Sequence, residues 1–375
     1  MRLAFCLFRY FPFGGLQRDF LRIAQACRER GHEVDVYAID WEGTVPEGLN
    51  LHLLEVSGLT NHGRARAFAR KLSERLAVEN YAAVVGFNKL PGLDLYFAAD
   101  PCFAARAAQR GPLYRLSGRY RTYAALEQAV FDVRSRTEIL LISEVEKPHF
   151  IHHYGTAEAR FHFLPPGISR DRMAPPDAVE RRELFRKAQG FAADERLLLM
   201  VGSGYRTKGL DRSIRALAAL PEALRDSTRL LVVGKGKGAP FLRLARQLGV
   251  AERVHLYGGR DDVPDFLLGA DLLLQPSYYE NTGTAIVEAL ASGLPVLATA
   301  NCGYAHYVAD ADAGKLVPMP FAQSVMNARL REMLSSGELP RWRENALGFA
   351  ARTDLYSLPK RAAEIIEAVA EGRGA

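Results

Sequence analysis

The sequence lacks the features that mark a membrane-spanning, disulfide-bonded or metal-binding protein. No uncharged apolar run approaches the roughly 20 residues that a transmembrane helix needs. The N-terminal apolar run is short and has no small-residue cleavage site, so it predicts a buried first strand and not a signal peptide. Cysteine is scarce, and its four positions have no metal-ligand spacing: Cys6, Cys27, Cys102 and Cys302. We therefore expect reduced thiols in a cytoplasmic protein without a metal site.

The chain is long enough for two domains, each with its own core. It has 375 residues, and single hydrophobic cores stop growing beyond about 250–300 residues. Apolar residues make up 48% of the chain and charged residues 25%, which is ordinary for a globular protein and excludes a disordered one. The net charge of +6 is mild. It admits an anionic partner such as a nucleotide, a phosphorylated substrate or a membrane surface.

Short apolar runs alternate with helical patterns in the C-terminal half. The runs predict strands at residues 197–202, 229–234, 253–258, 271–276 and 295–300. The helical patterns lie between them, at 210–220, 240–249, 263–270 and 284–293. Strands without polar alternation, separated by helices, predict a parallel sheet that is covered on both faces.

The N-terminal half begins in the same way. Residues 2–8 predict a strand, and an apolar face at helical spacing predicts a helix after it: Leu16, Phe20, Ile23, Ala24 and Cys27. Further strands are expected at 33–39, 50–56, 82–88 and 138–143. This half is therefore a second parallel α/β domain.

The fold class predicted is two tandem Rossmann-like, doubly wound domains that face each other across a cleft. The first spans residues 1–166 and the second 167–350, because Pro165, Pro166 and Gly167 can continue neither a helix nor a strand. A final helix at 351–375 is expected to pack back on the first domain. Ligands of such sheets bind beyond the carboxyl ends of the strands, so the loops that follow strands are the candidate site.

Three of these loops combine glycine with charged residues. Gly14 and Gly15 allow a close backbone approach to a ligand at a helix N-terminus, with Asp19 in the first helical turn. Arg206 and Lys208 stand just before a predicted helix and suit a diphosphate, although such a pair alone is more often simply solvated. Residues 235–238 are rich in glycine but lack the P-loop pattern.

Two glutamates, Glu280 and Glu288, flank the next such loop. Between them lie Asn281, Thr282, Gly283 and Thr284, and then an apolar run. The pattern predicts Glu280 just before a helix and Glu288 inside it. A solvated helix face is the plain alternative, and it holds for most glutamates.

These motifs resemble those of the retaining glycosyltransferases of family 4, which have the GT-B fold. Lys208-Gly209 with Asp211, and Glu280 with Gly283 and Glu288, match that family's pattern. Segments at 10–20, 86–100, 164–168, 302–311 and 354–359 resemble the branch that builds the core of bacterial lipopolysaccharide. The resemblance covers nearly the whole chain. It implies a UDP-sugar donor, no metal ion, no other cofactor, and an inner-core heptose of lipopolysaccharide as acceptor.

The resemblance also implies roles for individual residues. Lys208, Glu280 and Asp19 are the expected catalytic residues, with Asp19 as an acceptor-side base or orienting group. Lys208 and Arg206 would neutralise the diphosphate, Glu280 would contact the hexose and Glu288 the ribose. The remaining residues expected to bind the donor are Gly14, Gly15, Arg172, Arg260, Asn281, Thr282, Gly283 and Thr284.

Two positions depart from the branch that the chain resembles. Its glucosyltransferases have small apolar residues after the first glutamate, where this chain has Asn281 and Thr282. Because these positions would line the hexose pocket, the donor sugar is either glucose or N-acetylgalactosamine. A polar contact to a sugar substituent shifts such a preference strongly.

The segment 102–131 combines arginines and aromatic residues, with no acid from Phe103 to Tyr123. It predicts a basic amphipathic helix on an anionic membrane surface, at the inner face of the cytoplasmic membrane. The residues expected to contact lipid are Phe103, Arg106, Arg110, Tyr114, Arg115, Arg119, Tyr120 and Arg121. A surface helix packed on its domain remains open, whereas no recognition motif supports nucleic-acid binding.

Two alternatives to a transferase remain at this stage. A nucleotide-sugar epimerase of the same fold would turn over a UDP-sugar without any acceptor, and it gives the basic segment no purpose. A non-catalytic adaptor on an anionic membrane would not need Lys208, Glu280 and Glu288, all of which are present.

Overall fold

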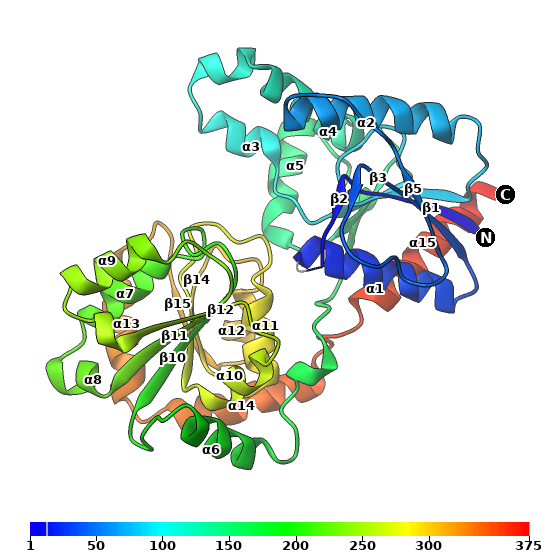
Figure 1. The fold of residues 1–375 in the computed structure, drawn as a ribbon. Helices are drawn as coiled ribbons and strands as arrows, with labels where there is room; N and C mark the ends of the chain where they lie inside the picture. Colours follow the sequence, from blue (N-terminus) through cyan, green and yellow to red (C-terminus); the bar gives the residue numbers. More distant parts are fainter. Residues whose placement is uncertain (13, 375) are drawn as a thin grey trace. The chain divides into compact units, whose positions relative to one another are not determined.

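The computed structural model describes residues 1–12 and 14–374, which fall into two compact units (Figure 1). Unit 1 combines residues 1–167 with the chain from Ser357 onward, and unit 2 spans Ile168–Tyr356. The C-terminal segment expected from residue 351 begins with the end of α14 (Leu339–Arg352), and the last helix itself starts at Leu358. The last helix, α15 (Leu358–Gly374), has Pro359 in its first turn, where no backbone donor is needed.

Unit 1 is built on a parallel sheet of seven strands. Its order is β5 (Leu49–Leu53), β3 (Glu33–Ala38), β1 (Arg2–Cys6), β6 (Ala83–Gly86), β7 (Leu95–Ala98), β8 (Glu138–Leu141) and β9 (Phe161–Phe163). A separate parallel pair joins β2 (Arg9–Tyr10) to β4 (Asp40–Trp41). Strands β7 and β9, of four and three residues, were not predicted.

Helices cover both faces of this sheet (Figure 1). Alternate residues of β1 point to opposite faces, so Leu3 and Phe5 join one core and Ala4 and Cys6 the other. The first core includes α1 (Gly15–Glu29) and α15, and the second α2 (Asn61–Leu76), α4 (Gly118–Phe131) and α5 (Lys147–Tyr154). Short 3₁₀ turns complete the unit: η1 (Pro112–Leu116), η2 (Glu144–Glu146) and η3 (Glu158–Arg160).

The basic segment 102–131 is not one amphipathic helix, so that prediction is wrong. It forms α3 (Phe103–Ala108), then η1, then α4. Gly111-Pro112 ends the first helical stretch, since proline lacks a backbone donor and restricts the residue before it. The Ser117 hydroxyl accepts a hydrogen bond from Tyr120 N at 3.1 Å and so starts α4 as a new helix.

Unit 2 is built on a parallel sheet of six strands. Its order is β12 (Val254–Gly258), β11 (Thr228–Val233), β10 (Arg196–Val201), β13 (Leu272–Gln275), β14 (Val296–Thr299) and β15 (Gly314–Val317). The first five agree with the predicted strands, and β15 was missed. Strand β15 begins with a glycine, which interrupts the apolar pattern in the sequence. Glycine is required there, because Gly314 adopts a φ of +150° and an added Cβ would lie 2.0 Å from the Val296 carbonyl oxygen.

Two apolar layers also flank the second sheet. One face packs against α7 (Leu210–Ala218), α9 (Ala239–Gln247) and α13 (Gln323–Ser335). The other packs against α6 (Ala178–Ala188), α10 (Val263–Gly269), α11 (Thr284–Ala291), α12 (His306–Asp310) and α14. The elements η4 (Arg170–Arg172), α8 (Glu222–Asp226) and η5 (Ala251–Arg253) complete the unit. Both units are therefore parallel α/β sheets covered on both faces, as predicted.

Within the described part of the chain, no helix is both long and apolar enough to cross a bilayer. The same residues contain no group of three or more His, Cys, Asp and Glu side chains arranged to hold a metal ion.

Candidate functional site

Two loops of unit 2 meet at the carboxyl ends of neighbouring strands. Strand β10 pairs in parallel with β13, so the loop 202–209 after β10 and the loop 276–283 after β13 leave the same edge of the sheet. Each loop ends in a glycine that precedes a helix, Gly209 before α7 and Gly283 before α11. Both glycines adopt a left-handed conformation, with φ values of +76° and +84°.

Gly209 brings the two loops into direct contact. A Cβ at this position would lie 2.1 Å from the Pro276 carbonyl oxygen, a distance that no side chain tolerates. The close approach places Lys208 against the other loop. Only glycine satisfies both the conformation and the space at this point.

Lys208 and Glu280 form an ion pair, although they are 72 residues apart in sequence. Gln275 Nε2 donates a second hydrogen bond, of 3.3 Å, to the same Glu280 oxygen. The lysine side chain is 21% exposed and the glutamate 12%, so the pair is partly shielded from water but open to a ligand. The carbonyl of Glu280 accepts from Gly303 N at 3.3 Å, which fixes its backbone. The structure thus joins the two residues for which the sequence suggested separate roles.

Arg212 holds the second loop in place, and the sequence analysis missed it. Its guanidinium lies between two rings, with 3.6 Å to the Tyr278 centroid and 3.7 Å to the Phe321 centroid. It donates to the carbonyl oxygens of Pro276 and Ser277, both at 3.1 Å. The Tyr278 hydroxyl donates to Asp211 at 2.7 Å. Helical spacing gave no signal for it, because Arg212 lies two residues from both Leu210 and Ile214 and so off the apolar stripe of α7.

Glu288 lies in the second turn of α11 and faces a cation. Arg172 Nε approaches Glu288 Oε1 at 3.6 Å, and both side chains are largely buried. The buried Nε and Nη1 atoms of Arg172 have no hydrogen-bond partner among the described residues. Such donors are rare in native proteins and are normally satisfied by a ligand or water. Glu288 is therefore not part of a solvated helix face.

The residues between the two glutamates surround the N-terminus of α11. The N-cap of this helix is Gly283, which has no capping side chain; Ile286 N donates to the Gly283 carbonyl at 2.8 Å, and the N–H groups before it can meet an anion. The Thr282 carbonyl accepts from Tyr304 N at 2.6 Å, which anchors the loop to the turn after β14. Asn281 and Thr282 are half-buried and Gly283 is buried.

The two other predicted cations of unit 2 differ from each other. Arg206 is exposed, and its side chain makes no ion pair or hydrogen bond with the described residues. Arg260 donates twice to the Asp262 carboxylate, at 2.8 and 2.5 Å, and its guanidinium lies 5.7 Å from the Phe266 ring centroid. The Arg206 side chain can therefore bind an anionic ligand, whereas Arg260 is already paired with the Asp262 carboxylate.

The other predicted donor residues, Gly14 and Gly15, lie in unit 1, as does Asp19. Gly14 is the N-cap of α1, and Gly15 is open, with nothing within 4 Å of an added Cβ. Asp19 is the fifth residue of α1 and so lies in its second turn, which corrects the predicted first-turn position. Burial raises the pKa of the Asp19 carboxyl, against the opposing charges of Arg18 and Arg22.

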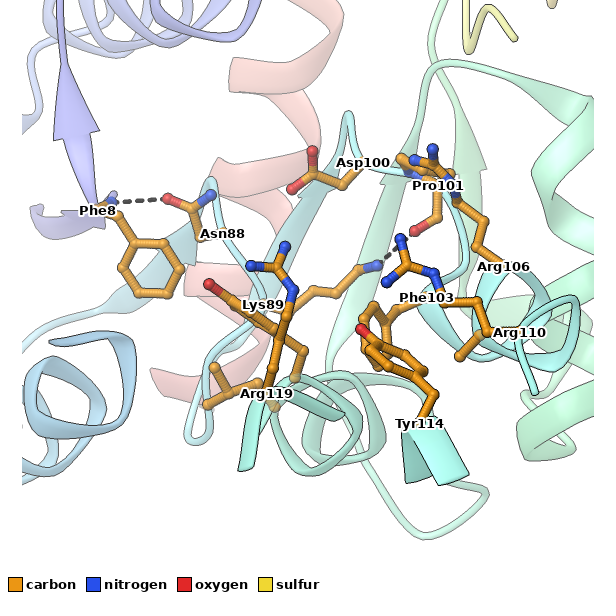
Figure 2. A pocket seen from close by; sticks show the side chains of 13 residues that line it. Phe8, Asn88, Lys89, Asp100, Pro101, Phe103, Arg106, Arg110, Tyr114 and Arg119 are labelled. Atoms are coloured by element: carbon orange, nitrogen blue, oxygen red, sulfur yellow. Dashed lines mark hydrogen bonds between the residues drawn. The ribbon is translucent and has the colours of Figure 1, made fainter. Parts of the chain in front are cut away.

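The basic segment lines a cavity of about 330 Å³ in unit 1 (Figure 2). Five of the residues predicted to contact lipid line it: Phe103, Arg106, Arg110, Tyr114 and Arg119. Tyr120 packs between Phe103 and Tyr114, with both centroid distances at 5.9 Å. Arg115 and Arg121 do not line the cavity and are exposed. The aromatic side chains therefore pack against one another, which the prediction of a single lipid-facing helix did not foresee.

Comparison with known proteins gives matches along nearly the whole chain. The model described as "Glycosyltransferase Family 4" matches residues 13–172, and "Glycosyl transferases group 1" matches residues 181–348. The lipopolysaccharide glucosyltransferase WaaG of Escherichia coli (strain K12) is 48% identical over 374 residues, which cover 99% of this chain and 100% of that protein.

Solved structures agree with these matches. A crystal structure of WaaG, described as a glycosyltransferase involved in lipopolysaccharide biosynthesis, superposes with a TM-score of 0.90 over 97% of this chain and 99% of that one, at 48% identity. The Anabaena protein Alr3699/HepE, solved with UDP and glucose, superposes with a TM-score of 0.73 over 98% of this chain and 100% of that one. At 18% identity, the second match supports the fold alone. Together with the two sheets, these likenesses confirm the predicted fold class.

Proposed function

This chain belongs to glycosyltransferase family 4, and we propose that it moves a hexose from a UDP-sugar to an inner-core heptose of lipopolysaccharide, with retention of configuration. It has the GT-B fold of that family. The acceptor class follows the full-length relative, a lipopolysaccharide glucosyltransferase that is 48% identical. The observation that carries the proposal is the Lys208–Glu280 ion pair at the ends of β10 and β13. A nucleotide-sugar can bind both members of this pair, the cation through its diphosphate and the carboxylate through its hexose hydroxyls.

The chemistry explains why cations gather at this place. Cleavage of the sugar–phosphate bond leaves negative charge on the UDP leaving group and positive charge on the sugar ring. Lys208 and the free Arg206 stabilise the diphosphate, and the uncapped N-terminus of α11 adds N–H donors. When the donor enters, Lys208 turns to the diphosphate and Glu280 to the hexose hydroxyls. Side chains and helix dipoles then supply the charge stabilisation that a metal ion provides elsewhere.

The second ion pair fits the nucleoside end of the donor. Glu288 binds the ribose hydroxyls, and the unsatisfied Nε and Nη1 atoms of Arg172 donate to donor oxygens. Arg260 marks the loop that receives the base. Gly14 and Gly15 offer backbone N–H groups to the donor, and Asp19 orients the acceptor, as the family resemblance implies.

The hexose is glucose or N-acetylgalactosamine, and the two differ in the group at C2 and in the configuration at C4. Glucose follows from the name of the full-length relative. The half-buried Asn281 and Thr282 favour a sugar with an extra polar substituent, because a polar contact to a sugar substituent shifts such a preference strongly.

The enzyme works at the inner face of the cytoplasmic membrane, where its acceptor is anchored. Leu113 and Leu116 expose 79% and 65% of their surface, and Arg115 and Arg121 lie beside them in the chain. Exposed leucines next to exposed arginines suit the headgroup region of an anionic leaflet. The membrane contact is therefore the outer side of the basic segment.

Transfer from a panel of UDP-sugars to lipopolysaccharide truncated after its heptoses tests this function. We expect transfer of one hexose, with the α configuration of the donor kept in the product as measured by NMR. Release of an isomeric UDP-sugar without acceptor would instead establish an epimerase. Vesicle binding without any UDP-sugar binding would establish an adaptor.

A further inference from the structure

We propose that the cavity of unit 1 binds an oxyanion, carboxylate or phosphate ester, carried on a sugar of the acceptor. The inference rests on the proposed function, since it names the part of the acceptor that unit 1 recognises. The cavity is lined by residues of unit 1 alone, and its volume of about 330 Å³ is in the range of small-molecule sites.

Two guanidinium groups of the cavity have unused donors. Arg110 lies 4.5 Å from the Tyr114 ring centroid, and Arg119 lies 5.3 Å from that of Tyr123. Neither side chain donates a hydrogen bond or forms an ion pair with the described residues, so both keep their N–H groups for a ligand. Figure 2 shows both guanidinium groups reaching into the cavity over Lys89. A planar guanidinium fixed on an aromatic face binds carboxylate or phosphate through two parallel hydrogen bonds.

The charge balance of the cavity favours an anion. Its lining contains four cations, Lys89, Arg106, Arg110 and Arg119, against the single carboxylate of Asp100. Lys89 is already neutralised by an ion pair with the buried Glu127 and also donates to the Pro101 carbonyl at 2.7 Å. The positive excess therefore belongs to the arginines. Arg110 and Arg119, whose side chains form no ion pair with the described residues, attract an anionic group more strongly than a neutral sugar.

The remaining lining suits a sugar ring. Phe103, Tyr114 and Tyr123 present aromatic surface, against which the C–H face of a pyranose packs. Asn88 Oδ1 accepts from Phe8 N at 2.7 Å, which directs its amide N–H₂ group away from the backbone and leaves it to a ligand hydroxyl. A mixture of apolar wall and few polar groups is typical of specific ligand sites.

Glu127 keeps this cavity in shape without any ligand. Its carboxylate is fully buried and accepts from Phe103 N at 2.7 Å and Ala104 N at 2.8 Å, the first two donors of α3. The Tyr154 hydroxyl donates to it at 2.7 Å. One side chain of α4 thus fixes the start of α3 and, with it, the aromatic wall at Phe103. A ligand that enters meets a preformed site.

Calorimetric titration of the full chain with glucuronate, glucose 6-phosphate and glucose tests the inference. We expect both charged sugars to bind and glucose to show no heat. The tighter of the two charged sugars identifies the oxyanion as a carboxylate or a phosphate ester. Equal binding of glucose, or binding of none of the three, would overturn the inference.

Matched double variants locate the site. The change Arg110→Gln with Arg119→Gln should weaken the charged sugars roughly tenfold or more, because two charge-assisted contacts are lost. The control Arg115→Gln with Arg121→Gln removes two arginines of the same segment outside the cavity and should leave the affinity unchanged. Equal losses in both variants would mean a diffuse charge effect and would overturn the inference.

Kinetics separates this inference from the proposed function. In the Arg110→Gln, Arg119→Gln variant we expect a higher KM for the lipopolysaccharide acceptor and an unchanged KM for the UDP-sugar. An unchanged acceptor KM would overturn the cavity as acceptor site while leaving the transferase intact. Failure of the unaltered protein to bind any UDP-sugar would instead remove the proposed function, and the sugar titration would still report on the cavity.

Discussion

The two basic sites of this protein hold their cations in different ways. In unit 2, Lys208 is paired with Glu280, and Arg172 lies 3.6 Å from Glu288. In unit 1, Arg110 and Arg119 lie on tyrosine rings and have no carboxylate partner among the residues that the structure describes. The first arrangement is nearly neutral before a ligand arrives, and the second carries an excess of positive charge. A ligand of unit 2 must therefore replace existing interactions, whereas a ligand of unit 1 only adds new ones.

This difference has a consequence for specificity. Replacing an ion pair is favourable only for a ligand that offers both an anion for the lysine and donors for the glutamate. A UDP-sugar offers both, and a simple anion does not. The unpaired arginines of unit 1 accept any oxyanion of suitable size, and their selectivity has to come from the aromatic wall.

The largest expected effect comes from breaking the pair in unit 2. Glu280→Ala or Lys208→Ala should lower kcat/KM for transfer by about 100-fold to 1,000-fold, as removal of one transition-state contact does elsewhere. The double variant should cost much less than the product of the two single losses, because each single change leaves its partner uncompensated. Steady-state transfer assays on the three variants measure this, and full activity in either single variant contradicts the site.

A glycine substitution tests the contact between the two loops of unit 2. Gly209→Ala should lower the free energy of unfolding by about 2 kcal/mol or more, because it adds a backbone clash to a left-handed conformation. Gly204→Ala is the matched control. Gly204 has a φ of +79° but nothing within 4 Å of an added Cβ, so only about 1 kcal/mol is expected. Equal losses in urea unfolding would show that the contact with Pro276 does not matter.

A substitution of Arg212 tests whether this residue positions the loop 276–283 of unit 2. Arg212→Lys keeps the charge but loses the planar group between Tyr278 and Phe321 and the two carbonyl contacts. We expect kcat to fall by roughly tenfold with UDP-sugar binding largely kept, since the loop that carries Glu280 loses its support. A purely structural role would lower the melting temperature without changing kcat of the folded enzyme.

Membrane affinity distinguishes the two sides of the basic segment in unit 1. Arg115→Gln with Arg121→Gln should weaken binding to phosphatidylglycerol vesicles by about 1 kcal/mol per arginine. Leu113→Ser with Leu116→Ser should weaken it further in a salt-independent way, because apolar contact is lost. Vesicle sedimentation measures both. A larger loss in the Arg110→Gln, Arg119→Gln variant than in these two would assign the lipid contact to the cavity.

The smallest expected effect concerns an exposed ion pair in unit 1. A hydrogen bond from Arg30 lowers the pKa of Glu367, with a further contribution from the Arg30 charge and from His32. Because the folded-state pKa is lower than the ordinary value of 4.5, the stabilisation is complete above that value and is lost as the pH falls through the folded-state pKa. Glu367→Gln should flatten this part of the stability profile. Glu364→Gln, whose partner Arg361 is on the same helix, should not.

The sequence predicted most of unit 2 and less of unit 1. Strands β10 to β14 are continuous apolar runs between helical patterns, and such runs can be recognised from the sequence as strands of a parallel sheet. The Lys208–Glu280 pair was not predictable from spacing, because it depends on the pairing of β10 with β13 and on the contact at Gly209. Arg212 was missed for the same reason, since its partners belong to another loop.

The composition of the basic segment 102–131 led to a wrong prediction of a single helix. Its arginines and aromatics predicted one amphipathic helix, but Gly111-Pro112 and the Ser117 cap divide the stretch into three elements. Once the chain turns back, Phe103, Tyr114 and Tyr123 face the cavity while Leu113 and Leu116 face outward. Periodicity is informative only within an unbroken element, and the break at Pro112 was visible in the sequence.

The most direct test of the account is transfer from UDP-glucose and UDP-N-acetylgalactosamine to heptose-terminated lipopolysaccharide, followed by mass and anomeric configuration of the product. The account predicts the addition of a single hexose from one of these donors in the α configuration, and its loss in Glu280→Ala. An inverted product, or undiminished transfer by Glu280→Ala, would contradict it.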